Sequence, residues 1–118
     1  MAGRGRPQAA LFAASRLAGL CLRVLLEPGE QDAAAALQTV AGVEAVLARA
    51  GITLPRLLHG AGQTVWRLID EAAARGHDTR LGFEDTLALP DGSLAPSNAV
   101  LVAEARRRVR KNGGWVSA

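Results

Sequence analysis

The sequence has a single cysteine, and this shortage excludes several kinds of site. Cys21 alone can form no disulfide within the chain and no zinc cluster built from several cysteines. A lone cysteine is typical of a cytosolic protein, so we predict a cytoplasmic location. Long apolar runs are also absent, since Arg16 and Arg23 interrupt the N-terminal one before it reaches the ~18 residues of a membrane span. We therefore expect no membrane partner, and we interpret residues 1–26 as a helix and a strand rather than a targeting signal.

Lysine is as scarce as cysteine, with Lys111 alone. Arginine therefore supplies nearly all of the positive side chains, and the formal net charge is +3. The basic run from Arg106 to Lys111 is of a kind that binds nucleic acid, but no aromatic side chain is interleaved in it to stack on bases. Cations also suit the C-terminus of a helix, where they complement its dipole, and Glu104 offsets part of the charge. We expect a solvated helix end here and no nucleic-acid partner.

Apolar patterns and turn residues predict alternating helices and strands in a chain of 118 residues. The expected helices cover residues 8–18, 31–50, 64–75 and 97–110, and the expected strands cover 20–26, 55–59 and 79–83. Strands that alternate with helices are typical of an α/β fold with a parallel sheet. Three strands fit either a small open sheet or the last three βα units of an eight-stranded barrel, which typically has about 250 residues.

An ionisable residue ends each predicted strand, directly before a turn. These residues are Glu27, His59 and Glu84, and Asp85 follows the last of them. In parallel α/β folds the carboxyl ends of the strands meet at one rim, where chemistry is carried out. Any one of them has the alternative interpretation of a solvated strand end, whereas the three together indicate a site.

The third predicted strand has an unusual distribution of side chains. Alternation along a strand would place Arg80, Gly82 and Glu84 on one face and Leu81 and Phe83 on the other. Unpaired charge is costly to bury, so a face that combines a base, a glycine and an acid is expected to line a site.

A glycine turn joins the second predicted strand to the next helix. Gly60 and Gly62 allow backbone N–H groups to approach an anion at a helix N-terminus. The pattern lacks the full dinucleotide fingerprint. We interpret Trp66, on the following helix, as a packing residue.

Longer motifs carry a family resemblance. Residues 76–86 read Gly-His-Asp-Thr-Arg-Leu-Gly-Phe-Glu-Asp-Thr, and Leu-Pro-Asp-Gly follows at 89–92. Leu-His-Gly-x-Gly-x-Thr-x-Trp at 58–66 and Asn-Ala-x-Leu-Val at 98–102 extend the pattern, as does Leu-Glu-Pro at 26–28. Together they resemble the C-terminal signature of the β-keto acid cleavage enzymes, whose founding activity is 3-keto-5-aminohexanoate cleavage in lysine fermentation. The resemblance implies that residues 1–118 form one partial domain, the last three βα units of a (β/α)8 TIM barrel.

The resemblance also implies a reaction and roles for residues. In that family a β-keto acid and acetyl-CoA exchange acyl groups in a metal-dependent reaction that yields acetoacetate and an acyl-CoA. The glutamate that matches Glu84 binds the metal, normally zinc, with two histidines of a His-x-His motif. The arginine and aspartate that match Arg80 and Asp85 together draw a proton from the substrate. The substrate-binding residues that we expect here are Glu27, His59, Gly60 and Gly62.

One part of the family pattern is missing. The histidines of this chain are His59 and His77, and neither belongs to a His-x-His motif. A catalytic zinc needs about three protein ligands, so Glu84 by itself should hold zinc only weakly. We therefore consider two alternatives: an enzyme completed by a homo-oligomer or a complementary half-barrel, and a truncated or split-barrel fragment with no activity of its own. For Arg80 and Asp85, a structural ion pair is the alternative interpretation.

Overall fold

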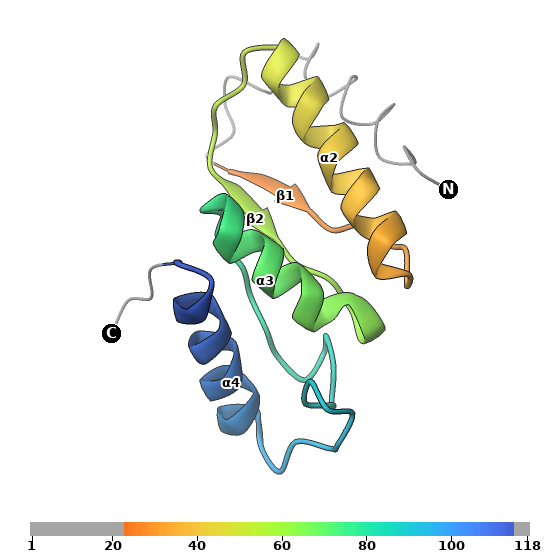
Figure 1. Ribbon diagram of the computed structural model, residues 1–118, viewed down its shortest axis with the longest axis vertical. Helices are drawn as coiled ribbons and strands as arrows, with labels where there is room; N and C mark the ends of the chain where they lie inside the picture. Colours follow the sequence, from red (N-terminus) through yellow and green to blue (C-terminus); the bar gives the residue numbers. More distant parts are fainter. Residues whose placement is uncertain (1–22, 115–118) are drawn as a thin grey trace.

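The computed structural model describes residues 23–114, which form a small α/β unit (Figure 1). Its elements are, in chain order, β1 (Val24–Leu26), α2 (Ala33–Arg49), β2 (Arg56–Leu58), the 3-10 helix η2 (Gly62–Thr64), α3 (Val65–Arg75) and α4 (Asn98–Lys111). The helix expected at 8–18, Cys21 and the first part of the strand expected at 20–26 lie outside the described residues.

The two strands run side by side in parallel, joined by α2, so the expected α/β arrangement with a parallel sheet is confirmed. The register pairs Leu25 with Leu57 and Leu26 with Leu58. Leu26 and Leu58 face the helices, whereas Leu25 lies on the opposite face and is 55% exposed. One face of the sheet is therefore covered by helices, and in the described part of the chain its other face exposes an apolar side chain.

The prediction of a third strand at residues 79–83 is wrong. Asp78 forms a single parallel bridge with Leu57, and no strand follows it within residues 79–114. The bridge consists of Leu58 N–H donating to the Asp78 carbonyl and Asp78 N–H donating to the Arg56 carbonyl, at 2.8 and 2.9 Å. The chain then turns at Gly82, whose carbonyl accepts from the N–H groups of Asp85 and Thr86, three and four residues later. Among the described residues no other strand lies beside residues 79–83. Their backbone therefore forms local hydrogen bonds instead of the hydrogen bonds of a sheet.

Capping residues set the ends of the helices where the sequence predicted them. Asp32 accepts from the N–H of Ala35 at the start of α2, and Ser97 caps α4 in the same way. Gly76 ends α3 with φ of 73°, a left-handed conformation that glycine adopts without a steric penalty. The predicted ends of these helices are therefore confirmed to within one or two residues.

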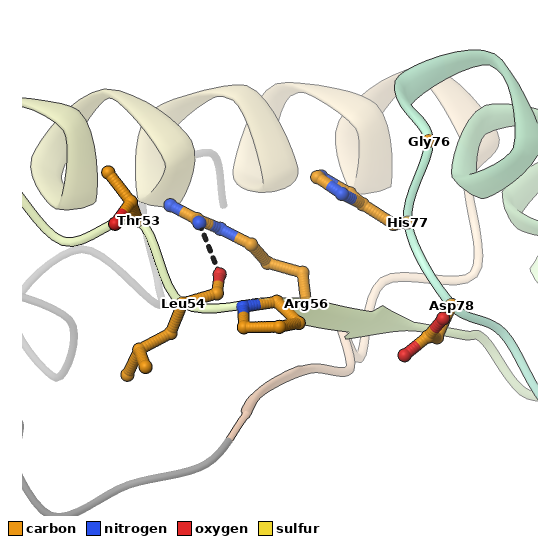
Figure 2. A pocket seen from close by; sticks show the side chains of 7 residues that line it. Thr53, Leu54, Arg56, Gly76, His77 and Asp78 are labelled. Atoms are coloured by element: carbon orange, nitrogen blue, oxygen red, sulfur yellow. Dashed lines mark hydrogen bonds between the residues drawn. The ribbon is translucent and has the colours of Figure 1, made fainter.

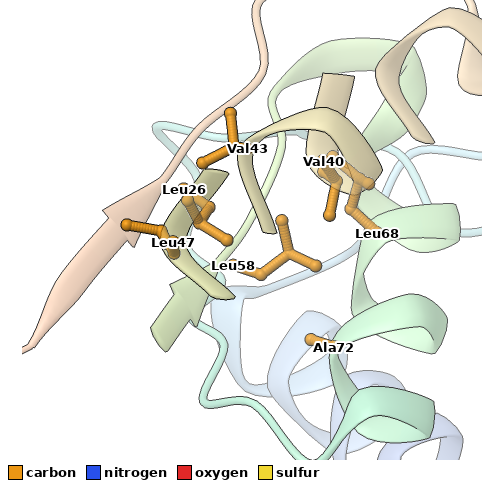
Figure 3. Close-up of a cluster of buried hydrophobic side chains, with 7 residues drawn as sticks. All are labelled: Leu26, Val40, Val43, Leu47, Leu58, Leu68 and Ala72. Carbon is orange, nitrogen blue, oxygen red and sulfur yellow. The ribbon is translucent and has the colours of Figure 1, made fainter. Parts of the chain in front are cut away.

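The main core lies between α2, α3 and the helix-facing side of the sheet (Figure 3). It contains Leu26, Val40, Val43, Leu47, Leu58, Leu68 and Ala72. A second cluster joins α3 to α4 through Val65, Ile69 and Ala105, with Trp66, Leu81 and Val109 packed against it. The two clusters position the strand ends and the loop between α3 and α4, where the candidate site lies.

Candidate active site

Three segments that are distant in the sequence meet at the carboxyl ends of β1 and β2. Glu27 follows β1, His59 follows β2, and Asp85 comes from the loop between α3 and α4. The N–H of His59 donates to the Leu26 carbonyl at 3.2 Å, which extends the pairing of the strands by one residue. The N–H of Gly62 donates to the Asp85 carbonyl at 2.8 Å, which ties the loop to the turn after β2. We refer to Glu27, His59, Asp85 and the neighbouring Arg80 as the strand-end cluster.

His59 is the buried centre of the strand-end cluster, with 1% of its surface exposed. Its Nε2 lies 3.5 Å from Glu27 Oε2, and its Nδ1 lies 3.8 Å from Asp85 Oδ1. The Nδ1 atom is also 3.3 Å from the carbonyl oxygen of Gly60. The imidazole thus separates two carboxylates, one at each ring nitrogen.

Asp85 is buried, with a side chain that is only 5% exposed. Its Oδ2 accepts from the N–H of Gly82 at 3.2 Å, and its Oδ1 lies 3.8 Å from the Nη2 atom of Arg80. The side chain of Arg80 is 50% exposed, so it is accessible to a molecule in solution. The expected pair of Arg80 and Asp85 is therefore brought together, in contact at ion-pair distance.

The predicted common face of Arg80, Gly82 and Glu84 is wrong, because residues 79–83 do not form a strand. Gly82 is buried, whereas Arg80 and Glu84 are exposed, and Phe83 is 43% exposed instead of packing on the helices. A Cβ at Gly82 would collide with the carboxylate of Glu84, which lies over the glycine. Glycine at this position therefore lets Glu84 fold back beside the loop that holds Asp85.

The described residues do not fit a complete zinc site. Among residues 23–114 no group of three or more histidine, cysteine, aspartate or glutamate side chains is arranged to hold a metal ion. The carboxylates nearest His59 lie at opposite ring nitrogens, so Glu27 and Asp85 cannot share one ion with the same nitrogen. Glu84 is an exposed candidate ligand. One ligand is fewer than the three protein ligands that a catalytic zinc requires.

The turn between β2 and α3 is held by a residue that the sequence interpretation did not identify. Gln31 donates its side-chain amide to the Ala61 carbonyl at 2.9 Å, and its Oε1 accepts from the N–H of Gln63 at 3.1 Å. The N–H groups of Gly62 and Gln63 therefore have partners within the chain, and an incoming carboxylate must displace Gln31 to reach the second. A glutamine before a helix gives no local signal for this contact, because the partner lies 30 residues away.

A shallow hollow of about 190 Å³ lies at the opposite ends of the strands (Figure 2). It is lined by residues 53–56 and 76–78. The side chains of Arg56 and His77 point from the sheet toward α2, where both contact Glu44, at 3.4 and 2.7 Å. Arg56 also donates to the carbonyls of Leu54 and Ile52. Arg56 and His77 therefore share Glu44 as an ionic partner, as expected of a stabilising contact at the amino ends of the strands.

Part of the basic run in α4 contacts α3. Arg108 donates to both carboxylate oxygens of Asp70 on α3, and its guanidinium carbon lies 5.9 Å from the centre of the Trp66 ring. The Trp66 Nε1 donates to the Ala88 carbonyl at 2.9 Å, and the ring packs in the second cluster. The interpretation of Trp66 as a packing residue is therefore confirmed.

Comparison with known protein families gives a match over nearly the whole chain. The sequence model of a family described as beta-keto acid cleavage enzyme matches residues 4–117. No curated protein matches the chain. Within residues 23–114, no helix combines the length and the apolar character that crossing a membrane demands.

Proposed function

Because the chain belongs to the beta-keto acid cleavage enzyme family, we propose that it carries the proton-transfer part of a site that exchanges acyl groups between a β-keto acid and acetyl-CoA. The products are acetoacetate and the CoA thioester of the remaining acyl group. The observation that supports this proposal most directly is the pair of Arg80 and Asp85, 3.8 Å apart at the carboxyl ends of the strands. The substrate class that we propose is that of 3-keto-5-aminohexanoate and related 3-keto acids.

The members of the pair have different environments, which suggests different tasks. Asp85 is buried and already accepts one backbone hydrogen bond, so its position is well defined. Arg80 is half exposed, and its planar guanidinium suits it to binding the carboxylate of a keto acid. Arginine is a poor base, so we assign proton abstraction at the substrate to the two residues acting together, with Asp85 Oδ1 as the acceptor.

Other residues at the same ends of the strands complete the proposal. We assign substrate contacts to Glu27, whose side chain is 47% exposed, and to the turn of Gly60 and Gly62. His59 was expected in the same role, but its burial favours an action through its neighbours. Glu84 is the metal ligand that we propose, for zinc bound weakly by this chain, and no step of the reaction is assigned to the ion.

The remainder of the site must come from outside the described residues. We propose that β1 and β2 belong to a (β/α)8 barrel completed by sequence on this chain or another one, in a homo-oligomer or with a complementary half-barrel. The exposed Leu25, on the sheet face that no helix within residues 23–114 covers, supports this arrangement, because parallel strands are normally covered on both faces. Sedimentation should give species larger than 12.3 kDa, and a compact monomer with a cooperative melt would contradict the proposal.

A graft into an active member of the family tests these assignments. The segment from β1 through α4 replaces the last three βα units of that enzyme, and acetoacetate formation and zinc content are measured. Glu84→Gln should lose zinc, because a neutral amide is a much poorer ligand. Asp85→Asn should retain zinc and lose turnover, because the amide cannot accept the proton.

Leu81→Ala is the matched control on the same loop. The half-buried Leu81 packs against the cluster between α3 and α4, so its truncation should lower stability and leave zinc content unchanged. Full turnover in Asp85→Asn, or zinc retained in Glu84→Gln, would refute the assigned roles. A grafted enzyme that folds and binds zinc but forms no acetoacetate would favour the alternative of a segment without activity.

A further inference from the structure

His59 is a buried side chain to which the proposed reaction gives no direct step. It is 1% exposed in the described part of the chain, and its Nε2 has no hydrogen-bond partner there. A buried polar nitrogen without a partner destabilises a fold, so the presence of histidine at this position requires an explanation. Within the strand-end cluster, Glu27 Oε2 lies 3.5 Å from Nε2.

The Asp85 carboxylate lies between His59 and Arg80. The same oxygen, Oδ1, is 3.8 Å from His59 Nδ1 and 3.8 Å from Arg80 Nη2. The other oxygen, Oδ2, is held by the N–H of Gly82. Because His59 is buried and Arg80 is half exposed, the carboxylate has the imidazole on its interior side and the guanidinium on its accessible side.

We propose that His59 is a positioning residue, whose imidazole holds the Asp85 carboxylate so that Oδ1 stays directed at Arg80. Glu27 supports the opposite edge of the ring, so the strand-end cluster alternates acid, imidazole, acid and guanidinium. This inference rests on the proposed function, since it gives His59 a part in placing the proton-transfer pair. His59 then acts through Asp85, and the substrate does not touch it.

The two ring nitrogens can be tested separately. In His59→Asn the side-chain amide nitrogen replaces Nδ1, whereas in His59→Gln it replaces Nε2. The amide proton of Gly82 reports the position of the Asp85 carboxylate, because it donates to Oδ2. In NMR spectra of the full chain, His59→Asn should retain the Gly82 amide shift and His59→Gln should displace it and accelerate its hydrogen exchange.

A second measurement leaves His59 in place, in case both variants fail to fold. The chain has two histidines, so the ring nitrogen resonances are assigned by comparison with His77→Gln. Asp85→Asn should shift the Nδ1 resonance of His59, and Glu27→Gln should shift its Nε2 resonance. The resonances of His77, which contacts Glu44 on α2, should stay unchanged and serve as the control.

The outcomes separate this inference from the proposed function. An unchanged His59 ring in Asp85→Asn, or equal effects of His59→Asn and His59→Gln on the Gly82 amide, would overturn the positioning role. These spectra are recorded on the 118-residue chain and do not depend on turnover. The acetoacetate assay of the grafted enzyme decides the proposed function, so turnover without the expected shifts overturns this inference alone.

Discussion

An ion pair joins α3 to α4, the helices on either side of the segment 77–97, which carries Arg80, Glu84 and Asp85. Arg108 donates from Nε and Nη2 to the two oxygens of Asp70, at 3.0 and 2.6 Å. Asn112 donates to the same carboxylate at 3.0 Å, and Trp66 lies beneath the guanidinium. The two charged side chains are 22% and 19% exposed, so solvent screens their attraction only in part.

A double-mutant cycle of Arg108→Ala and Asp70→Ala measures this coupling. Hydrogen bonds to charged groups contribute about 1.5–3 kcal/mol, whereas exposed ion pairs contribute about 0.2–1 kcal/mol. A bidentate pair that is about one-fifth exposed lies between these limits, so we expect a coupling energy of about 1–2 kcal/mol. Arg108→Lys should lose roughly half of it, because an ammonium group contacts one oxygen at a time and does not stack on the indole.

Urea denaturation followed by circular dichroism provides the free energies of unfolding for the cycle. The control is the pair of Arg107 and Glu104, which has the same two distances, 3.0 and 2.6 Å, but lies within α4 with Arg107 58% exposed. Its coupling should be clearly smaller, since the geometry is equal and the burial is not. Equal coupling energies for the two pairs would refute the argument that burial strengthens the interhelical one.

Three further predictions concern the glycine turn, a surface carboxylate and the metal. Gly60→Ala should destabilise the chain by about 1–3 kcal/mol, because its Cβ would lie 2.5 Å from Thr64 Oγ1 and 2.7 Å from Leu68 Cδ1; unchanged urea denaturation would contradict this. Hydrogen bonds from the Ser93 hydroxyl and then its N–H lower the pKa of Asp91, so their stabilising effect is present above the unfolded pKa and is lost as the pH falls through the folded one. Ser93→Ala should therefore raise the pKa of Asp91 in a carboxyl NMR titration, and an unshifted titration would count against the hydroxyl contact. The chain alone should lose zinc on dialysis, as measured by mass spectrometry, and stoichiometric retention would show that it holds more ligands than Glu84.

Local signals in the sequence predicted the helices well. Asp32 and Ser97 cap α2 and α4 in the structure, and Gly51 and Gly76 have the left-handed conformation that ends a helix. The ends of β1 and β2 were also predicted, since an apolar run stops at a turn in each case. The convergence of Glu27 with His59 at one rim then follows from the parallel arrangement of the strands.

The contacts that depend on distant partners were not predictable in the same way. Residues 79–83 have the composition of a strand, but a strand requires a paired neighbour, and Asp78 alone bridges to β2. The approach of Asp85 to His59 depends on the turn at Gly82, and the role of Gln31 depends on a turn 30 residues later. Because residues 79–83 form no strand, the alternation of side chains assumed for them wrongly placed Phe83 on the same buried face as Leu81.

The path of the acetyl carbon tests the central claim most directly. The grafted enzyme is incubated with a 3-keto acid and acetyl-CoA labelled with ¹³C at the carbonyl carbon, and the products are analysed by NMR. Acyl exchange predicts label at C3 of acetoacetate and none in the new acyl-CoA, because the acetyl group joins the first two carbons of the keto acid. Acetoacetate without label, or label in the new thioester, would contradict the assignment of this chain to β-keto acid cleavage.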